Sequence, residues 1–306
     1  MKIGVAGAGA VGCHYGSLLQ QGGLDVVYLA RGEHLVTLRQ KGLTHISNGR
    51  AYHHDLQASD DAGILADCDV ILLTSKTTVL EHMCVQITPS IRPDALLITM
   101  QNGVTAPDQV ASHFPSNPLI AGSAFIGVRL EKPGFVIHSA AGHLRMGWWQ
   151  GKREPWLSLF DELLSAWNDS GVDAQEVGDM KAMLWHKLLW NCGFNAITAL
   201  TRRFAKDIVA EEESARWVRS AMQETIDVAA ACGVTLADDA IEQHISLTME
   251  TGEVKTSMWQ DMEHDRPTEI EAMNGFVAQK ARELGLEAPV NDMLASLIRA
   301  ASERGI

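Results

Sequence analysis

The chain has no long apolar segment, no run of basic residues and no paired cysteines. No apolar stretch reaches the roughly 18 residues that a membrane span requires, so a membrane is not expected as a partner. Lys and Arg number 25 against 38 Asp and Glu, giving a formal net charge of −13. Nucleic acid and anionic membranes attract clustered positive charge, so neither is expected to bind.

The cysteines and histidines are scattered along the chain. Five cysteines form no Cys-x-x-Cys pair, which indicates buried thiols in a reducing cytoplasm; they are Cys13, Cys68, Cys84, Cys192 and Cys232. None of the 12 histidines has a spacing that gathers metal ligands. The pair His53 and His54 is expected in a polar loop. We therefore predict no metal site.

Glycines are concentrated at the amino terminus, where they follow an apolar run. Residues 2–6 have the length of a buried strand, residues 11–21 are typical of a helix, and residues 25–29 of a second strand. The segment between strand and helix is G-x-G-x-x-G, made by Gly7, Ala8, Gly9, Ala10, Val11 and Gly12. In this place the motif predicts a dinucleotide site, with the pyrophosphate on the helix N-terminus. The apolar run is too short and glycine-broken for a signal peptide, so a cytoplasmic protein is expected.

The residue after the second strand indicates which dinucleotide binds. An acid at this position binds the ribose 2′-hydroxyl of NAD, whereas an arginine accommodates the 2′-phosphate of NADP. Arg31 stands near this position in Tyr28-Leu-Ala-Arg31-Gly-Glu-His34, so we expect NADP(H). Glu33 is close enough to keep NAD as the alternative.

Strand-like and helix-like segments alternate through the first half of the chain. Strands are predicted at 69–74 and 95–99, a helix at 79–87, an antiparallel pair within 123–149 turning at 132–134, a helix at 155–168 and a strand at 171–177. From Gly178 onward the pattern is helical. The 306 residues suffice for two domains. We predict an α/β chain: a Rossmann-like, doubly wound sheet domain (1–177) that binds dinucleotide and an all-helical domain (178–306) for substrate binding or dimerisation.

Two loops follow predicted parallel strands, at the edge where such sheets bind ligands. Lys76 lies in the first loop and Asn102 in the second. Both are candidate site residues by position. The alternative is an exposed loop lysine and a turn asparagine before glycine.

A second group of candidates lies on one apolar helix. Lys187, Asn191 and Asn195 recur every four residues within 183–200, so an amine and two carboxamides share one face. Burying an unpaired ammonium costs several kcal/mol or lowers its pKa, which makes Lys187 a plausible proton donor. The alternative is that Lys187 extends to solvent and the asparagines make structural hydrogen bonds.

A third group lies nearer the carboxyl end. Pro267 suits the first turn of a new helix, which places Glu269 where a carboxylate is favoured by the helix dipole. Glu269 is therefore either a site carboxylate or a group that serves only its helix. Ser257 is either a site hydroxyl or a helix cap.

Together these motifs resemble the ketopantoate reductase (2-dehydropantoate 2-reductase) family along essentially the whole chain. The resemblance rests on the glycine motif, Gln101-Asn102-Gly103, the 187–195 helix segment and Ser257 to Glu269. It implies NADPH-dependent reduction of 2-dehydropantoate to (R)-pantoate on the route to pantothenate. It implies that Lys187 is the general acid and Glu269 a catalytic carboxylate. It also implies contacts with the substrate from Asn102, Asn191, Asn195 and Ser257. The cofactor would be contacted by Asn102 and Lys76, and its 2′-phosphate by Arg31.

Two departures from the family pattern affect the expected substrate. Ala196 stands where the family commonly has proline, and the sequence around Lys76 is Thr-Ser-Lys-Thr-Thr. Neither change removes a proton donor, but both can reshape a pocket. A reductase of another 2-oxoacid and a dinucleotide-binding sensor without turnover are therefore the alternatives. A homodimer formed through the helical half is a further expectation.

Overall fold

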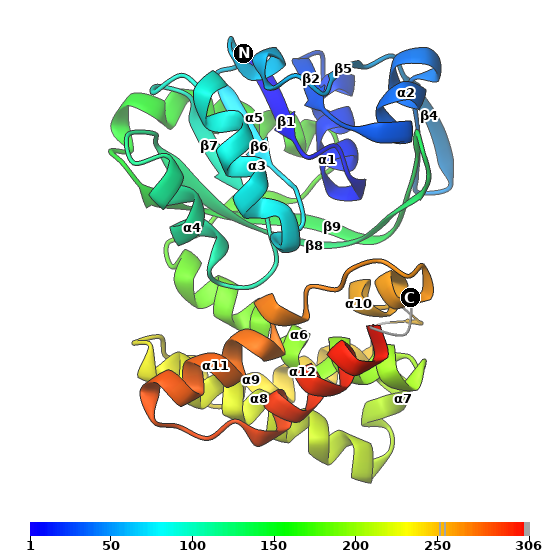
Figure 1. The fold of residues 1–306 in the computed structure, drawn as a ribbon, viewed down its shortest axis with the longest axis vertical. Helices are drawn as coiled ribbons and strands as arrows, with labels where there is room; N and C mark the ends of the chain where they lie inside the picture. Colours follow the sequence, from blue (N-terminus) through cyan, green and yellow to red (C-terminus); the bar gives the residue numbers. More distant parts are fainter. Residues whose placement is uncertain (251, 254, 303–306) are drawn as a thin grey trace. The chain divides into compact units, whose positions relative to one another are not determined.

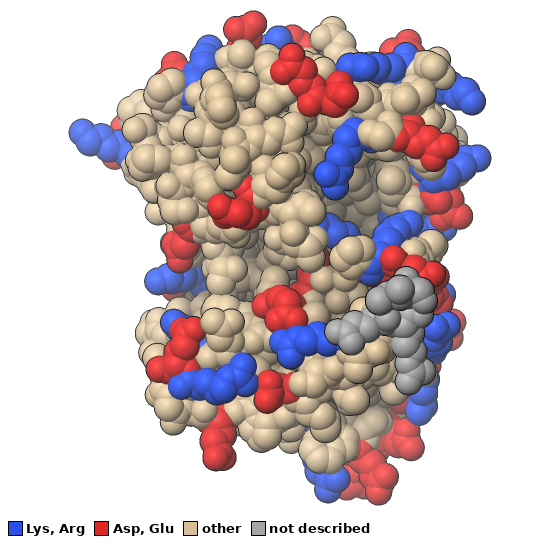
Figure 2. Space-filling view, viewed as in Figure 1, with Lys and Arg blue, Asp and Glu red and all other residues tan. Residues whose placement is uncertain are grey.

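The computed structural model describes residues 1–250, 252–253 and 255–302. Its contacts divide the chain into two compact units, Met1–Gln101 with Thr105–Met180, and Asn102–Val104 with Lys181–Ile306. The described strands all lie in the first unit and the second is helical (Figure 1), so the predicted fold class is confirmed. On the face drawn in Figure 2, basic and acidic side chains are interspersed.

The first unit is built on a sheet of ten described strands. They are β1 (Lys2–Ala6), β2 (Asp25–Leu29), β3 (Leu43–Ser47), β4 (Arg50–His54), β5 (Gln57–Ser59), β6 (Val70–Leu73), β7 (Leu96–Thr99), β8 (Leu119–Lys132), β9 (Phe135–Gln150) and β10 (Ala174–Glu176). The order is β4-β3-β9-β8-β7-β6-β1-β2-β5, with β10 beside β9. From β5 to β8 all neighbours are parallel and follow the 3-2-1-4-5-6 order of dinucleotide-binding sheets. The chain order reverses between β1 and β6.

Helices cover both faces of this sheet. They are α1 (Ala10–Gln21), α2 (Gly32–Lys41), α3 (Leu80–Ile87), α4 (Ala106–His113) and α5 (Leu157–Asp169), with 3-10 turns η1 (Ala62–Leu65), η2 (Thr77–Val79), η3 (Thr88–Ser90) and η4 (Glu154–Trp156). Apolar residues of α1, α2 and α5 share one core, and those of α3 and α4 another. β6 supplies alternate residues to each: Val70 and Leu72 to the first, Ile71 and Leu73 to the second. Burying each such side chain stabilises the fold by roughly 1.5–3 kcal/mol, which explains the continuous apolar run.

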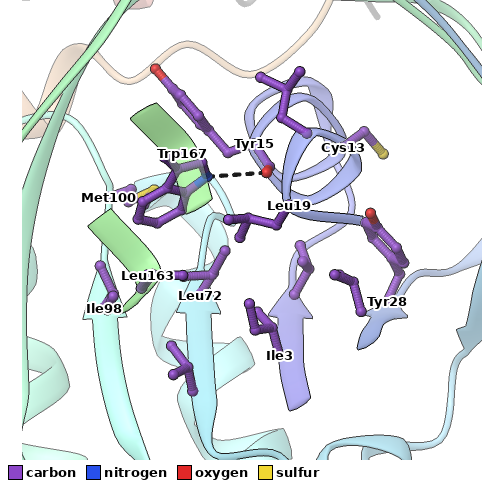
Figure 3. Packing of buried hydrophobic residues seen from close by; sticks show 14 of the residues in the cluster. Ile3, Cys13, Tyr15, Leu19, Tyr28, Leu72, Ile98, Met100, Leu163 and Trp167 are labelled. Carbon is purple, nitrogen blue, oxygen red and sulfur yellow. Dashed lines mark hydrogen bonds between the residues drawn. The ribbon is translucent and has the colours of Figure 1, made fainter. Parts of the chain in front are cut away.

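A buried hydrogen bond joins the two helices on the first face. The indole N–H of Trp167 in α5 donates to the carbonyl of Tyr15 in α1 at 3.2 Å (Figure 3). Both side chains are fully buried. The bond satisfies the indole nitrogen inside the core, where an unpaired polar group would cost about 1–3 kcal/mol. It fixes α1, the helix that follows the glycine motif.

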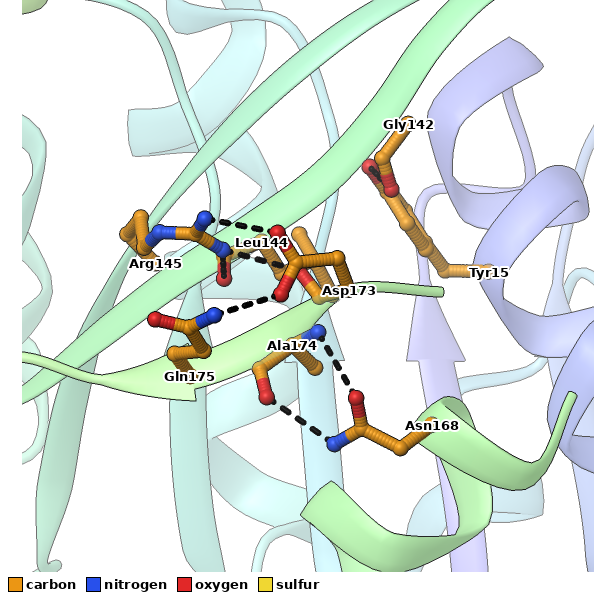
Figure 4. Close-up of polar contacts among 8 residues, drawn as sticks. All are labelled: Tyr15, Gly142, Leu144, Arg145, Asn168, Asp173, Ala174 and Gln175. Atoms are coloured by element: carbon orange, nitrogen blue, oxygen red, sulfur yellow. Dashed lines mark hydrogen bonds and ion pairs between the residues drawn. The ribbon is translucent and has the colours of Figure 1, made fainter. Parts of the chain in front are cut away.

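The hairpin β8–β9 extends the parallel sheet with an antiparallel pair, as predicted. β10 then pairs in parallel with β9. Side chains secure this edge: Arg145 binds the Asp173 carboxylate at 2.7 Å, and the Asn168 amide bonds both the N–H and the carbonyl of Ala174 (Figure 4).

One sequence prediction for this unit is wrong. His53 and His54 lie in β4, not in a polar loop, and the ring of His54 is buried. β4 pairs with β3, and β3 pairs in parallel with β9, about 90 residues further along the chain. Local sequence does not report such a long-range partner, so a polar edge strand has the same local pattern as a loop.

The second unit consists of helices around α6. They are α6 (Met180–Thr201, whose first residue belongs to the first unit), α7 (Ala205–Val209), α8 (Glu212–Ala231), α9 (Ala240–Glu250), α10 (Ser257–Glu263), α11 (Asn274–Leu284), α12 (Pro289–Ser302) and the 3-10 turn η5 (Ile270–Ala272). Residues 191–199 of α6 are all buried. At Gly193 an added Cβ would lie 2.6 Å from the Met222 side chain of α8, so glycine permits this close packing.

In the first unit, His14 of α1 and His45 of β3 form a buried hydrogen-bonded pair. Nδ1 of His14 lies 2.9 Å from Nε2 of His45, and the other nitrogen of His45 lies 3.3 Å from Ser17 Oγ. The Ser17 hydroxyl donates to the His14 carbonyl, so it accepts from His45, and His45 in turn accepts from His14. This chain of donors requires the His45 ring to be neutral, because its Nε2 must accept. Burial lowers the pKa of His14 well below its usual value and that of His45 to about 4, and nearby histidines add to the effect.

We predict that acid destabilises the first unit. The folded pKa of His45 lies below the unfolded value near 6.5, so the unfolded chain binds more protons and stability falls as pH drops below about 6.5. His45 alone accounts for about 2 kcal/mol between pH 6.5 and 5. Urea unfolding at pH 7.5, 6 and 5 measures this loss. His45→Gln should reduce the pH slope, and the exposed His53→Gln should preserve it. Equal stability at pH 7.5 and 5 would contradict the prediction.

Candidate active site

The polar face of α6 is the centre of the candidate site. Lys187, Asn191 and Asn195 lie within one helix at four-residue spacing, so the predicted shared face is confirmed as helical geometry. Asn191 is 5% and Asn195 2% exposed, deep in a helix that otherwise packs apolar side chains. Polar groups so placed need partners.

The side-chain amides of Asn191 and Asn195 pair only some of their hydrogen-bonding groups with each other. Nδ2 of Asn195 donates to Oδ1 of Asn191 at 3.4 Å and contacts Sδ of Met273 at 3.2 Å. In the described part of the chain, Nδ2 of Asn191 and Oδ1 of Asn195 have no hydrogen-bond partner. Each such group costs about 1–3 kcal/mol when buried. One free donor beside one free acceptor is suited to a ligand group that both accepts and donates.

Lys187 precedes this pair by one turn. Burial lowers the pKa of Lys187 to about 8, and the negative charge of Glu269 opposes the shift. The ammonium therefore remains mostly protonated at neutral pH but is a stronger acid than a lysine in water. The predicted role of Lys187 as a proton donor stays a prediction.

Glu269 is bound to Asn102. The Asn102 amide donates to Oε2 of Glu269 at 2.7 Å, and Glu269 is only 7% exposed. Asn102 lies three residues after the end of β7, yet Asn102–Val104 belong to the helical unit. The structure thus brings together Lys187, Glu269 and Asn102, three residues that the sequence placed in separate motifs.

Gly103 allows this arrangement. Its φ is +82°, and an added Cβ would lie 2.5 Å from the carbonyl oxygen of Ala272. A larger residue would therefore be strained and would push the loop away from η5. The Gln101 side chain, which precedes the loop, bonds the carbonyls of Leu73 and Ser75 at the end of β6.

The predicted helix start at Pro267 is wrong. Pro267 lies in an irregular segment, Glu269 is the N-cap residue of the short turn η5, and α11 begins at Asn274. Contacts of the 266–269 segment within the folded unit override the local preference of proline for a first helical turn. Glu269 therefore does not lie in the first turn of a long helix, and its predicted catalytic role stays a prediction.

Ser257 is not the cap of α10. The adjacent Thr256 fills that position and accepts from Trp259 N, while Ser257 is exposed at the first helical residue. Thr256 also bonds Thr198 of α6 at 2.8 Å. The structure gives Ser257 no side-chain hydrogen bond to a described residue, so its predicted contact with substrate stays a prediction.

Sequence reasoning missed two residues of this region. Thr198 is fully buried three residues after Asn195, and its spacing from Lys187, Asn191 and Asn195 is the signal that could have found it. Met273 contacts Asn195 from a distant segment, and no local pattern reports that contact.

The glycine motif has the geometry of a phosphate-binding turn. Gly7 has φ +108°, and an added Cβ would lie 2.6 Å from the backbone of Ser75. At Gly12 a Cβ would strike the Gly7 carbonyl, so α1 packs closely on β1. At Gly9 a Cβ would meet no described atom within 4 Å. The first and third glycines thus serve packing, and the second leaves space for a ligand to approach the backbone. The residues present fit a dinucleotide.

Ala8, Ala10 and Val11 complete this turn at the start of α1. No side chain caps the helix at Gly9, so its N-terminal amides remain available to an anion. The turn is held by bonds from Gly9 N to the Gly7 carbonyl (2.7 Å) and from Ala8 N to the Leu29 carbonyl (3.1 Å).

Arg31 and Lys76 follow the carboxyl ends of β2 and β6, the two strands that flank β1. Arg31 comes after β2, is the N-cap residue of α2 and is exposed. Lys76 comes after β6 as the N-cap residue of η2. Glu33 lies in the first turn of α2, so both residues considered for the ribose are at this edge.

Among the described residues, no three His, Cys, Asp or Glu side chains are grouped so that they could hold a metal ion. None of the described helices is both long and apolar enough to span a bilayer.

The chain matches two protein-family models in sequence order. Residues 3–151 match the model described as Ketopantoate reductase PanE/ApbA, and residues 179–302 match Ketopantoate reductase PanE/ApbA C terminal. A 2-dehydropantoate 2-reductase of Halobacterium salinarum is 26% identical, with 100% of both chains covered. The crystal structure of a 2-dehydropantoate 2-reductase from Geobacter metallireducens is 30% identical, with 98% of this chain and 100% of that chain covered and a TM-score of 0.90. A structure of D-mandelate dehydrogenase with NADH and anilino(oxo)acetate is 25% identical, with 99% of both covered and a TM-score of 0.91.

We predict that Glu269→Gln lowers the pKa of Lys187 below about 8. Glu269 raises that pKa by its charge, and glutamine keeps a similar shape without the charge. NMR titration of lysines carrying ¹³C-methyl groups, with Lys187→Met for assignment, measures the change. Glu271→Gln is the matched control, because Glu271 pairs with Arg299 instead. An unchanged or higher pKa in Glu269→Gln would refute the coupling.

Proposed function

The chain belongs to the ketopantoate reductase family of oxidoreductases, and from this premise we propose that it reduces 2-dehydropantoate to (R)-pantoate with NADPH, in pantothenate biosynthesis. In this proposal residues 1–177 hold the dinucleotide and residues 178–306 supply the groups that bind the substrate. Lys187 is the general acid and Glu269 a substrate-binding and catalytic carboxylate.

The observation that carries the choice of substrate is the unmatched pair of buried amide groups on Asn191 and Asn195. A hydroxyl group donates to Oδ1 of Asn195 and accepts from Nδ2 of Asn191, so a single hydroxyl satisfies both. 2-Dehydropantoate carries such a hydroxyl besides its ketone and carboxylate. An oxoacid with an apolar ring in its place would leave both amide groups unpaired, at about 1–3 kcal/mol each.

The chemistry assigned to these residues is proton transfer and charge stabilisation. NADPH supplies the hydride for the ketone carbon. Lys187 donates a proton from Nζ to the ketone oxygen as negative charge develops there, which typically contributes 10²–10⁴-fold. Glu269, held by Asn102, keeps the lysine protonated before the reaction. In this proposal Asn102 and Ser257 also bind the substrate.

Cofactor binding is assigned to the edge of the sheet. The turn from Gly7 to Gly12 receives the pyrophosphate on the α1 N-terminus, Lys76 and Asn102 provide further contacts, and Arg31 meets the 2′-phosphate. The preference for NADPH over NADH rests on Arg31. Glu33 in the same turn keeps NADH as the alternative.

A second candidate is an NAD(P)-dependent dehydrogenase of an aromatic 2-hydroxy acid. The similarity to D-mandelate dehydrogenase along 99% of the chain favours it. The polar Asn191–Asn195 pair weighs against it. A sensor without turnover is a third candidate, but sensing does not require a lysine of lowered pKa beside a buried carboxylate.

The decisive experiment follows NADPH absorbance with the purified protein. We expect 2-dehydropantoate to be reduced with a kcat/KM about 10² or more above that of phenylglyoxylate, which lacks the hydroxyl. NADH run in parallel tests the cofactor preference. A preference for phenylglyoxylate would replace the substrate, and NADPH binding without oxidation by any 2-oxoacid would leave the sensor.

We expect Lys187→Ala to lower kcat by about 10²–10⁴-fold, because the proton donor is lost. The dissociation constant of NADPH, measured by its fluorescence, should stay nearly the same. Lys181→Ala is the matched control, since Lys181 is exposed on the same helix. Turnover within a few-fold of the unmodified protein would exclude Lys187 as the general acid.

A further inference from the structure

His34 joins three parts of the first unit. It lies in the first turn of α2, three residues after Arg31. Its Nδ1 accepts a hydrogen bond from the backbone N–H of Gly134, in the β8–β9 turn, at 3.0 Å. On the other side, Nε2 faces the Ala8 backbone in the glycine motif and lies 3.7 Å from the Cys13 sulfur in α1.

These partners define the state of the ring. Because Nδ1 accepts from Gly134, it carries no proton, and the neutral ring holds its proton on Nε2, towards the Ala8 carbonyl. Burial lowers the pKa of His34, which favours the neutral ring at physiological pH. The Cys13 thiol itself donates to the Ala8 carbonyl at 3.4 Å, so both groups converge on that oxygen.

The glycine motif and the start of α2 depend on His34 to different degrees. The motif has other anchors: Gly9 N to Gly7 O, Ala8 N to Leu29 O, and the Thr74 hydroxyl to Gly7 O at 2.8 Å. The start of α2 has fewer. No side chain caps it at Arg31, and its first helical bond, from Leu35 N to the Arg31 carbonyl, is long at 3.3 Å. Loss of His34 should therefore release the α2 start and leave the motif in place.

We propose that His34 is a positioning residue for the cofactor, which ties the first turn of α2 to the glycine motif and so directs Arg31 towards the dinucleotide's 2′-phosphate. This inference rests on the proposed role of Arg31. It assigns His34 an effect that is selective for NADPH, because NADH has no 2′-phosphate to receive Arg31.

A double-mutant cycle tests this, with dissociation constants of NADPH and NADH measured by fluorescence. His34→Ala should weaken NADPH binding about fivefold, the worth of about one hydrogen bond, and NADH binding less than about twofold. Arg31→Ala should weaken NADPH by more. In the Arg31→Ala background, His34→Ala should change NADPH affinity less than about twofold, since coupled residues are not additive.

Equal loss of NADPH and NADH affinity, or additive effects in the double variant, would overturn the proposal. His53→Ala is the control, an exposed histidine on β4 of the same unit. If His34→Ala does not fold, His34→Asn replaces it, because its side-chain oxygen still accepts from Gly134 N while the ring contact with Ala8 is lost. Turnover of 2-dehydropantoate is measured separately, so failure of the proposed reaction and failure of this coupling are distinct results.

Discussion

The burial of Asn191 and Asn195, with the partly buried Lys187 one turn before them, is the constraint on which the candidate site depends. Leucines on this face would cost less free energy on folding. Each unpaired buried amide group costs about 1–3 kcal/mol, and an ammonium taken out of water costs more. The folded unit supplies partial compensation through Glu269, Met273 and the bond between the two asparagines. Among the described residues, the donor Nδ2 of Asn191 and the acceptor Oδ1 of Asn195 are left without a partner. These are groups that a hydroxylated 2-oxoacid can complete.

Glycines set the geometry around these polar groups. Gly103 lets the loop after β7 pack on η5, which brings Asn102 to Glu269. Gly193 lets α6 approach α8, which keeps the polar face of α6 inside a dense core. In the sheet unit, Gly7 and Gly12 allow α1 to pack closely on β1 and on the residues after β6, and a Cβ at Gly9 would meet no described atom within 4 Å. Each glycine is needed for a different contact.

The family relationship fixes the chemistry more firmly than the substrate. Chains of similar fold that carry the names 2-dehydropantoate 2-reductase and D-mandelate dehydrogenase both align along nearly all of this chain. A shared scaffold therefore accommodates different acids, and in our proposal the discrimination comes from Asn191 and Asn195. Family membership likewise does not decide between NADPH and NADH, because Arg31 and Glu33 both lie at the start of α2.

The sequence alone determined the elements with strong local signals. The G-x-G-x-x-G turn, the apolar strands β1, β2, β6 and β7, and the polar stripe on α6 follow from periodicity, which reports what a residue's own element will be. It did not determine β3 and β4, whose partner β9 is distant in the chain, nor the irregular segment around Pro267. It also did not determine that Asn102 bonds Glu269 across 167 residues, that Thr256 and not Ser257 caps α10, or that His34 contacts Gly134. Those are contacts between distant segments, and only the tertiary fold decides them, because their free energy depends on packing rather than on local propensity.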